Sequence, residues 1–376
     1  MSEHSDRGRD ALAAVVDPVL FQTLGELGAI VSFERSALGL RAVLAVASEE
    51  YPEPDELHRR AVAVLEAAEP GVGVSVELEA LDEDDRNELG LLLHRLAGDD
   101  GAPAASGGER MSPLSQPSSR TRVLAIASGK GGVGKSTVTV NLAVALARAG
   151  RTVGLLDADI YGFSVPRMLG VESPPLLVGR TIVPPVTHGV RTMSTGFFVD
   201  EDKAIAWRGP MLHKALEQFL VDVHWGQPEF LVVDMPPGTG DVALSVAQQL
   251  PRAELYVVTT PQAAAQRVAQ RAGALARQLK LPLRGVIENM SYFATPDGMR
   301  YEIFGHGGGA ELAESLGVPL LAQVPLVPEV REGADDGRPA AVVAPDGEVA
   351  AVFDALAQRV IDLGPARLYR RELKIS

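Results

Sequence analysis

The chain has 376 residues and a formal net charge of −14 at pH 7, from 49 acidic and 35 basic residues. This acidic balance disfavours nucleic acid and anionic membranes as partners, because both are polyanions that the mean field of the protein repels. The complete lack of cysteine excludes disulfides, thiol catalysis and thiolate metal ligands.

The first residues, MSEHSDRGRD, carry charges of both signs and no apolar run, so they do not resemble a secretory signal. No stretch of about 18 uninterrupted apolar residues occurs in the chain, and a membrane-spanning helix needs about that length. We therefore expect a cytoplasmic protein without a membrane anchor. A prior of about 150 residues per domain predicts two or three structural units.

Residues 1–97 are predicted to form a small α+β domain. Strand-like apolar runs surround one helical pattern; the runs are residues 27–33, 40–47 and 72–81, and the helical pattern is 55–68. The carboxylates at positions 82–85 are interpreted as a solvated turn. Residues 98–121 are rich in Gly, Pro and Ser, a composition that predicts a flexible linker.

Residues 122–376 are predicted to form an α/β domain. Short apolar runs alternate there with helical segments; the runs are RVLAIA, TVGLLD, FLVVD, ELYVVTT, LRGVIEN and PLLAQVP. Strands buried on both faces have this composition, and the alternation predicts a mostly parallel sheet flanked by helices. The first helix, residues 135–149, is apolar nearly all round, and Gly150 is suited to end it.

A glycine-rich string follows the first apolar run and leads directly into that helix. It consists of Gly129, Lys130, Gly131, Gly132, Val133, Gly134, Lys135, Ser136 and Thr137. A strand, a glycine loop and a helix in this order are what a Walker A phosphate loop requires, so a P-loop NTPase fold is predicted. Backbone N–H groups of the loop would surround nucleotide phosphates at the positive end of the helix. Lys135 is expected to hold the β- and γ-phosphates, and the Ser136 hydroxyl to ligate Mg²⁺.

Three aspartates follow predicted strands, at the sheet edge where open α/β folds bind ligands. Asp157 and Asp159 lie in LLDADIYG, and Asp234 lies in FLVVDMPPGTGD. Asp234 is interpreted as the Walker B acid that holds Mg²⁺ through water. An isolated aspartate is more often a turn or helix-capping residue. The phosphate loop upstream favours the functional interpretation here.

The string GKGGVGKST resembles the deviant P-loop ATPases, which include the MinD, ParA, nitrogenase iron protein and Mrp families. Lys130 is the extra lysine that marks this version of the loop. The resemblance implies that Lys130 reaches across a homodimer to the partner's nucleotide. It also implies that Asp159 positions the attacking water and that Asp157 lies in the outer shell of the metal. Lys130, Lys135 and Asp159 would then be the catalytic residues.

Base preference is indicated by the segment GVIENMSYF, which stands where guanine-specific P-loop proteins carry an NKxD-type segment. In the resembling ATPases the asparagine of this segment, here Asn289, hydrogen-bonds adenine. Pro325 lies where the family packs backbone against the base. The resemblance therefore implies ATP rather than GTP as the cofactor, together with Mg²⁺.

The stretch from residue 122 to about 363 resembles the Mrp branch, also called ApbC, whose ATPases bind and deliver iron–sulfur clusters. The strings that carry this resemblance are DADIYGFS, WRGPMLHKALEQFL, VDMPPGTGDVALS, TTPQAAAQRVAQRAG, ENMSYF, RYEIFGHGGG and ELKIS. It implies a homodimer with iron–sulfur assembly or recipient proteins as partners. Residues 10–97 are similar to the small MIP18-like domain that often precedes Mrp ATPases.

The chain departs from this branch in its metal ligands. Most members carry a CxxC pair after NMSYF that holds the cluster at the dimer interface, whereas Thr295 and Gly298 stand in those places here. Iron–sulfur clusters strongly favour thiolate ligands. Asp297 and His306 lie nearby in sequence, but a lone loop histidine is more often exposed or bonded to backbone. We hypothesise that a partner supplies the cysteines while this chain acts as a nucleotide-gated scaffold.

Two other functions compete with that of an iron–sulfur ATPase. A positioning ATPase of the MinD or ParA class would need a basic membrane helix or a basic DNA-binding surface. The segment after Gly364, PARLYRRELKIS, is short and polar, and the net charge disfavours DNA. A nucleotide sensor that does not hydrolyse ATP is the other possibility, and substitution of Asp159 distinguishes it from an ATPase.

Overall fold

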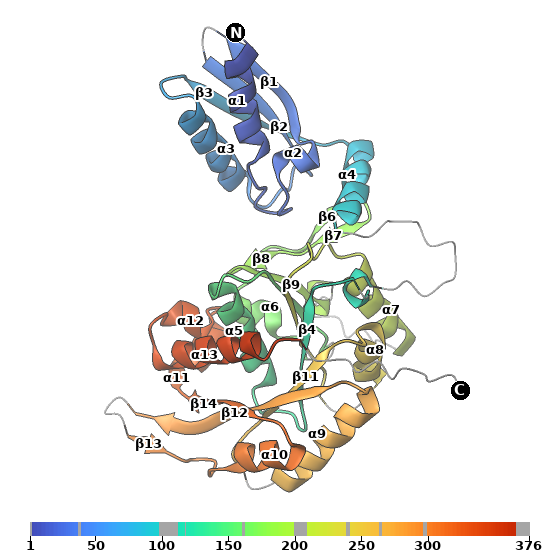
Figure 1. Cartoon of the computed structure of the whole chain (residues 1–376), viewed down its shortest axis with the longest axis vertical. Coiled ribbons are helices and arrows are strands. Elements are labelled where there is room, and N and C mark those ends of the chain that lie inside the picture. Colours follow the sequence, from blue (N-terminus) through green and yellow to red (C-terminus); the bar gives the residue numbers. More distant parts are fainter. Residues whose placement is uncertain are drawn as a thin grey trace, which may run out of the picture. The chain divides into compact units, whose positions relative to one another are not determined.

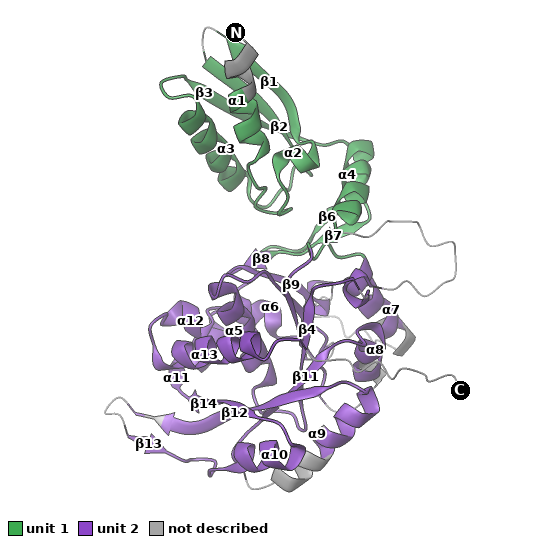
Figure 2. Ribbon diagram, in the orientation of Figure 1, with its two compact units in different colours: residues 1–108, 173–185, 222–226 green, residues 109–172, 186–221, 227–376 purple. Residues whose placement is uncertain are grey.

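The computed structural model describes residues 2–36, 39–97, 112–116, 118–159, 162–198, 209–237, 241–262, 265–295 and 299–365. The chain divides into two compact units (Figure 2): a first unit of residues 1–108, 173–185 and 222–226, and a second unit of 109–172, 186–221 and 227–376. The predicted segments 1–97, 98–121 and 122–376 group the chain differently, since two later stretches join the first unit. Those segment boundaries stay a prediction.

The first unit contains a three-stranded sheet in the order β1-β2-β3, with β1 antiparallel and β3 parallel to β2. Its described elements are α1 (Ser2–Ala13), α2 (Leu24–Leu27), β1 (Ile30–Ser36), β2 (Gly39–Val46), α3 (Pro54–Ala68), β3 (Val74–Ala80), α4 (Glu83–Leu96), β6 (Leu176–Val178) and β7 (Thr181–Val183). In α3 the buried residues Leu57, Ala61 and Leu65 recur every fourth position, so one helix face packs against the sheet. The three predicted strands and the helix are therefore present.

The carboxylates at positions 82–85 begin a helix and are not a turn, so that interpretation was wrong. Asp82 is the N-cap of α4, and its side chain accepts a hydrogen bond from the Asp85 N–H at 2.9 Å. Acidic side chains in the first turn stabilise the positive end of the helix dipole. The same negative charges that indicate a solvated turn therefore favour a helix start.

The second unit contains a nine-stranded sheet among the described residues. Its order is β13-β12-β11-β4-β10-β5-β9-β8, and β14 pairs with β12. The strands are β4 (Arg122–Ser128), β5 (Val153–Asp157), β8 (Val186–Thr187), β9 (Val190–Ser194), β10 (Phe230–Asp234), β11 (Glu254–Thr259), β12 (Leu283–Ala294), β13 (Arg300–Tyr301) and β14 (Leu320–Leu326). Only the short strands β8 and β13 pair antiparallel among the described strands of this sheet. The predicted, mostly parallel sheet is confirmed.

Helices cover both faces of this sheet, with α5, α12 and α13 on one side and α7, α8 and α9 on the other (Figure 1). The helices are α5 (Lys135–Arg148), α6 (Val165–Leu169), α7 (Gly209–Val221), α8 (Asp241–Gln249), α9 (Ala265–Leu279), α10 (Gly308–Leu316), α11 (Pro328–Asp335), α12 (Ala340–Val343) and α13 (Glu348–Asp362). Helix α5 is apolar all round because it lies between the sheet and α13, where Leu142, Leu146 and Phe353 are fully buried in one core. None of the helices in the described part of the chain combines the length and apolar content of a bilayer crossing.

Part of the predicted linker packs against the second unit. Residues Pro113–Ser115 form a 3-10 turn in which Leu114 is buried. The Ser112 hydroxyl donates a hydrogen bond to the Leu220 carbonyl at 2.8 Å. Ser115 also donates to the Gln249 carbonyl, and Arg252 donates to the carbonyls of Gln116 and Ser119. Several contacts therefore anchor the chain before β4, although the surrounding composition is typical of a linker. The C-terminal residues 366–376, part of the segment compared with a membrane helix, lie outside the described residues.

Candidate functional site

The glycine-rich loop joins the end of β4 to the start of α5, as the Walker A interpretation requires. Gly132 and Gly134 both have φ of +76°, a left-handed conformation that favours glycine. A β-carbon at position 134 would also lie 2.2 Å from the Asn289 Nδ2 atom. Glycine is therefore required at position 134 by both its backbone conformation and its neighbour.

The start of α5 is suited to an anion. Gly134 is the N-cap and forms no side-chain capping bond, so the first N–H groups of α5 are not satisfied by a side-chain cap. These groups and the helix dipole place partial positive charge where the loop closes. Lys135 begins the helix and is only 7% exposed. The residues present thus fit the phosphates of a nucleotide.

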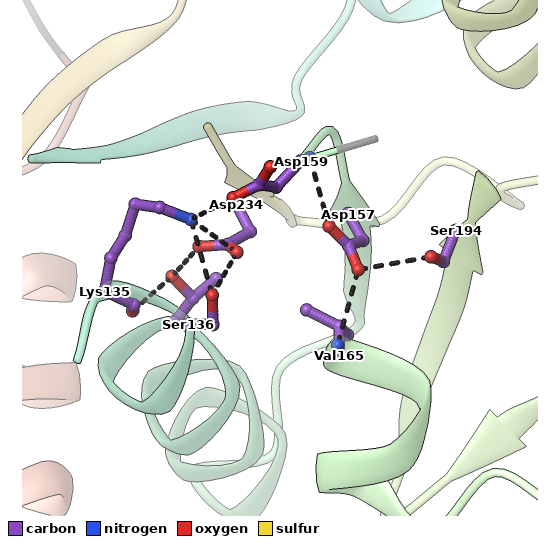
Figure 3. A network of polar contacts seen from close by, with 8 residues as sticks. Lys135, Ser136, Asp157, Asp159, Val165, Ser194 and Asp234 are labelled. Carbon is purple, nitrogen blue, oxygen red and sulfur yellow. Dashed lines mark hydrogen bonds and ion pairs between the residues drawn. The ribbon is translucent and has the colours of Figure 1, made fainter. Parts of the chain in front are cut away.

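The three predicted aspartates meet at this point (Figure 3). Asp157 ends β5 and Asp234 ends β10, and the two are register partners in neighbouring parallel strands. The Lys135 ammonium lies 2.6 Å from the Asp234 carboxylate and 3.9 Å from that of Asp159. Parallel strands end at one edge of the sheet, which brings together residues that are 77 positions apart in sequence.

Hydroxyl groups complete the cluster. The Ser136 hydroxyl donates to Asp234 at 2.6 Å, and the Thr139 hydroxyl donates to its other oxygen at 2.7 Å. The Ser194 hydroxyl donates to Asp157 at 3.1 Å. Thr139 and Ser194 were missed from the sequence. Thr139 lies one helical turn after Lys135, a spacing that could have identified it.

The cluster carries excess negative charge, since three carboxylates surround one ammonium. Burial raises the pKa of Asp157 to about 7, and the neighbouring Asp234 carboxylate adds to this shift. Partial burial also raises the pKa of Asp159. A divalent cation would relieve this repulsion, and hydroxyl and carboxylate oxygens are the donors that Mg²⁺ prefers. No group of three or more His, Cys, Asp or Glu suited to a metal occurs in the described part of the chain.

The raised pKa of Asp157 predicts a pH-dependent stability. In the folded state Asp157 keeps its proton up to about pH 7, whereas the ordinary pKa of an aspartate is 3.8. The raised pKa therefore stabilises the folded state most at low pH, and this stabilisation is lost as the pH rises toward 7. We expect the unfolding free energy of Asp157→Asn, relative to the wild type, to rise by about 3 kcal/mol from pH 5 to pH 8. Urea unfolding without nucleotide at both pH values measures this change. If the unfolding free energies of the wild type and Asp157→Asn changed equally with pH, the prediction would be wrong. A constant difference between the two proteins would reflect only the lost hydrogen bonds.

A cavity of about 450 Å³ lies beside the loop. The predicted base contacts Asn289 and Pro325 both line it, together with Thr137 at the start of α5, Met168 of α6 and Val330 of α11. Asn289 is also bonded to the loop itself, because its Nδ2 atom donates to the Val133 carbonyl at 2.9 Å. The cavity is large enough for a nucleoside, and the roles of Asn289 and Pro325 in binding a base stay predictions.

Lys130 lies apart from the carboxylate cluster. Its ammonium donates to the Gln262 side chain at 2.8 Å, and the Gly129 carbonyl before it accepts a long bond of 3.4 Å from Arg271. The structure therefore does not bring Lys130 to the aspartates of its own chain. Its predicted action on a partner's nucleotide stays a prediction.

Of the residues at the family's CxxC positions, Thr295 lies within the described part of the chain. The Thr295 hydroxyl donates to the Met299 carbonyl at 3.0 Å within the hairpin of β12 and β13. His306 is 80% exposed and lies 2.9 Å from the Glu302 carboxylate, as expected of a solvent-exposed loop histidine. Asp297 and Gly298 lie outside the described residues. These donors do not fit an iron–sulfur cluster, which favours thiolates.

Three comparisons identify similar proteins. A family model described as ParA, NUBPL iron-transfer P-loop NTPase, matches residues 119–361. An iron-sulfur cluster carrier protein of Mycobacterium leprae (strain TN) is 44% identical over 362 residues, covering 93% of this chain and 91% of the relative. Among solved structures, a nucleotide-binding protein of Archaeoglobus fulgidus in complex with ADP is 34% identical, with a TM-score of 0.54, and covers 62% of this chain and 93% of that chain. The cell division ATPase MinD of Pyrococcus furiosus is 25% identical, with a TM-score of 0.51. The match covers 64% of this chain and 99% of the MinD chain. The similarity to the mycobacterial relative extends beyond the range of the family model.

Proposed function

The chain belongs to the ParA/NUBPL family of iron-transfer P-loop NTPases, and on this premise we propose that it binds and hydrolyses Mg-ATP as a homodimer in iron–sulfur cluster assembly or transfer. The observation that supports this most is the contact of Lys135 and Ser136 with Asp234 at the uncapped start of α5. The Lys135 ammonium, the Ser136 hydroxyl and the Asp234 carboxylate, which the proposal assigns to phosphate and Mg²⁺, lie within hydrogen-bond distance of one another there. Such a group has no evident packing role.

Each residue of the cluster has a role in nucleotide binding under this proposal. The loop N–H groups and Lys135 bind the phosphates, and Ser136 with Asp234 and Asp157 would hold Mg²⁺, either directly or through water. When bound, Mg²⁺ supplies positive charge that neutralises the phosphate oxygens. Lys135 now contacts Asp234, so phosphate and the carboxylate would compete for the same ammonium.

Hydrolysis requires a water molecule directed at the γ-phosphate. Asp159 is suited to this because its side chain is 15% exposed, whereas Asp157 and Asp234 are fully buried. Asp157 accepts a hydrogen bond from the Asp159 N–H at 3.1 Å and so fixes the position of Asp159. We propose that Asp159 orients the attacking water while Lys135 and the partner's Lys130 stabilise the charge of the transition state.

Base preference provides the first test of this site. Asn289 and Pro325 line the cavity beside the loop, and we propose that they contact adenine. Titration calorimetry should show ATP binding that requires the loop and is strengthened by Mg²⁺, with GTP bound at least about tenfold more weakly. Equal affinity for GTP would contradict the proposed base contacts, and absence of ATP binding would contradict the proposed function.

The iron–sulfur cluster would be a substrate that passes between partner proteins in the cytoplasm. The mycobacterial relative is named as a cluster carrier, but this chain has no cysteine. We therefore propose that assembly or recipient partners supply the thiolates. The ATPase cycle of this dimer would control their association.

Anaerobic reconstitution with iron and sulfide tests where the cluster ligands come from. We expect the purified chain to bind no stoichiometric cluster, with or without Mg-ATP, because no thiolate is available. Iron analysis and visible absorbance measure this directly, with a CxxC-containing relative as the positive control. About one cluster per dimer would contradict the proposal and assign ligation to side chains such as His306.

A further inference from the structure

The side chain of Asn289 connects the cavity to the phosphate loop. Its Nδ2 atom donates to the Val133 carbonyl at 2.9 Å across 156 positions of sequence. A carbonyl oxygen can only accept, so the amide nitrogen must face it. Asn289 is 5% exposed and Val133 is 1% exposed. The bond is therefore shielded from water. In such a buried position, the loss of one partner leaves the other unsatisfied and is costly.

The strand that carries Asn289 is held by contacts with β14 and α10. Asn289 pairs with Val324 in the parallel strand β14. The preceding residue, Glu288, is buried, and its carboxylate accepts from the Gly309 N–H at the start of α10 and from the Gln323 side chain at 2.9 Å. These contacts fix the backbone of β12 where Asn289 projects. The asparagine therefore has support that does not come from the loop.

The loop at the other end of the bond depends on such an anchor. Val133 stands between Gly132 and Gly134, which both adopt the left-handed conformation. Glycine has many accessible backbone conformations, so an unrestrained loop would lose the arrangement of its N–H groups. The bond to Asn289 holds the Val133 carbonyl toward β12. A carbonyl held there would leave the neighbouring N–H groups of the loop available to phosphates.

We propose that Asn289 is a positioning residue for the phosphate loop, and that it acts on phosphate binding even when no base is present. The inference rests on the proposed nucleotide site and deepens it. Because the same side chain lines the cavity, occupation of the cavity and the geometry of the loop are coupled through one amide group. A contact that served the base alone would leave phosphate affinity unchanged.

Inorganic triphosphate, which has the phosphates of ATP without its nucleoside, separates these roles. Calorimetry with Mg²⁺ would compare triphosphate and ATP on the wild type, Asn289→Ala and Asn289→Asp. Ionised aspartate has the shape of asparagine and keeps its acceptors, but it has no hydrogen to donate to Val133. Val330→Ala is the matched control, because Val330 lines the cavity from α11 and its side chain has no group that could hydrogen-bond to the loop. Thermal unfolding verifies that each variant is folded, and Asn289→Ser replaces any that is not.

Both Asn289→Ala and Asn289→Asp are expected to weaken triphosphate binding by about tenfold. Val330→Ala should weaken ATP binding and leave triphosphate binding unchanged. If the Asn289 variants bind triphosphate as the wild type does, the positioning role is wrong while the nucleotide site stands. If the wild type binds neither ligand, the proposed function itself is wrong.

Discussion

Replacement of Lys135 by alanine is expected to lower the rate of ATP hydrolysis by at least about a thousandfold. Lys135 is the ammonium at the start of α5, where phosphate charge would gather, and it is 7% exposed. Its loss also leaves the buried Asp234 carboxylate without its cation. Phosphate release under saturating Mg-ATP measures the rate.

The same substitution should change stability. Removing one partner of a buried ion pair typically costs about 3 kcal/mol or more, although the hydrogen bonds from Ser136 and Thr139 to Asp234 remain. Lys214→Ala, on an exposed position of α7, is a matched control that removes a lysine outside the site. If the rate of ATP hydrolysis by Lys135→Ala were within tenfold of the control's rate, Lys135 would not be a catalytic residue.

Substitution of Lys130 by alanine is expected to lower hydrolysis by about a thousandfold while ATP binding is retained, because cationic groups supplied in trans contribute at least this much. Within one chain the Lys130 ammonium contacts Gln262 and not the aspartates. Asp159→Asn should be similarly inactive for a different reason, since it removes the group that orients water.

Mixing the two inactive variants tests the action in trans. In a mixed dimer the site of the Lys130→Ala subunit keeps its own Asp159 and receives Lys130 from the other subunit. Random assembly of equal amounts should restore about a quarter of the wild-type rate, because half of the dimers carry one intact site. No recovery would mean that Lys130 acts within its own subunit or that the chain does not dimerise. The separate variants, each at full concentration, are the controls.

Much of the second unit could be predicted because its signals are local. A glycine loop between an apolar strand and an apolar helix has few other interpretations, and parallel strands place Asp157 and Asp234 at one edge. Thr139 follows from helical spacing once Lys135 is identified. The short strand β9, with Ser194 at its end, was missed because VRTMS is buried yet half polar. Its burial depends on pairing with β5, which no local pattern indicates.

The first unit and the loop anchor show where local signals fail. The carboxylates at 82–85 fit a turn and a helix start equally well, and only the apolar residues Leu89 and Leu93, buried on one face, decide for a helix. Asn289 was predicted to contact a base, but its bond to Val133 joins residues 156 positions apart. Such a contact depends on the order of the strands in the sheet. Sequence spacing alone could not identify it.

Steady-state phosphate release by the wild-type chain tests the central claim most directly. With ATP and Mg²⁺ we predict turnover that stops when Mg²⁺ is chelated and that is much slower with GTP. The rate should not depend on whether ATP or Mg²⁺ is added first. Phosphate release by Lys135→Ala should remain at the background rate under the same conditions. Turnover that persists without Mg²⁺, or binding of ATP with no release of phosphate under any condition, would contradict an Mg-dependent ATPase.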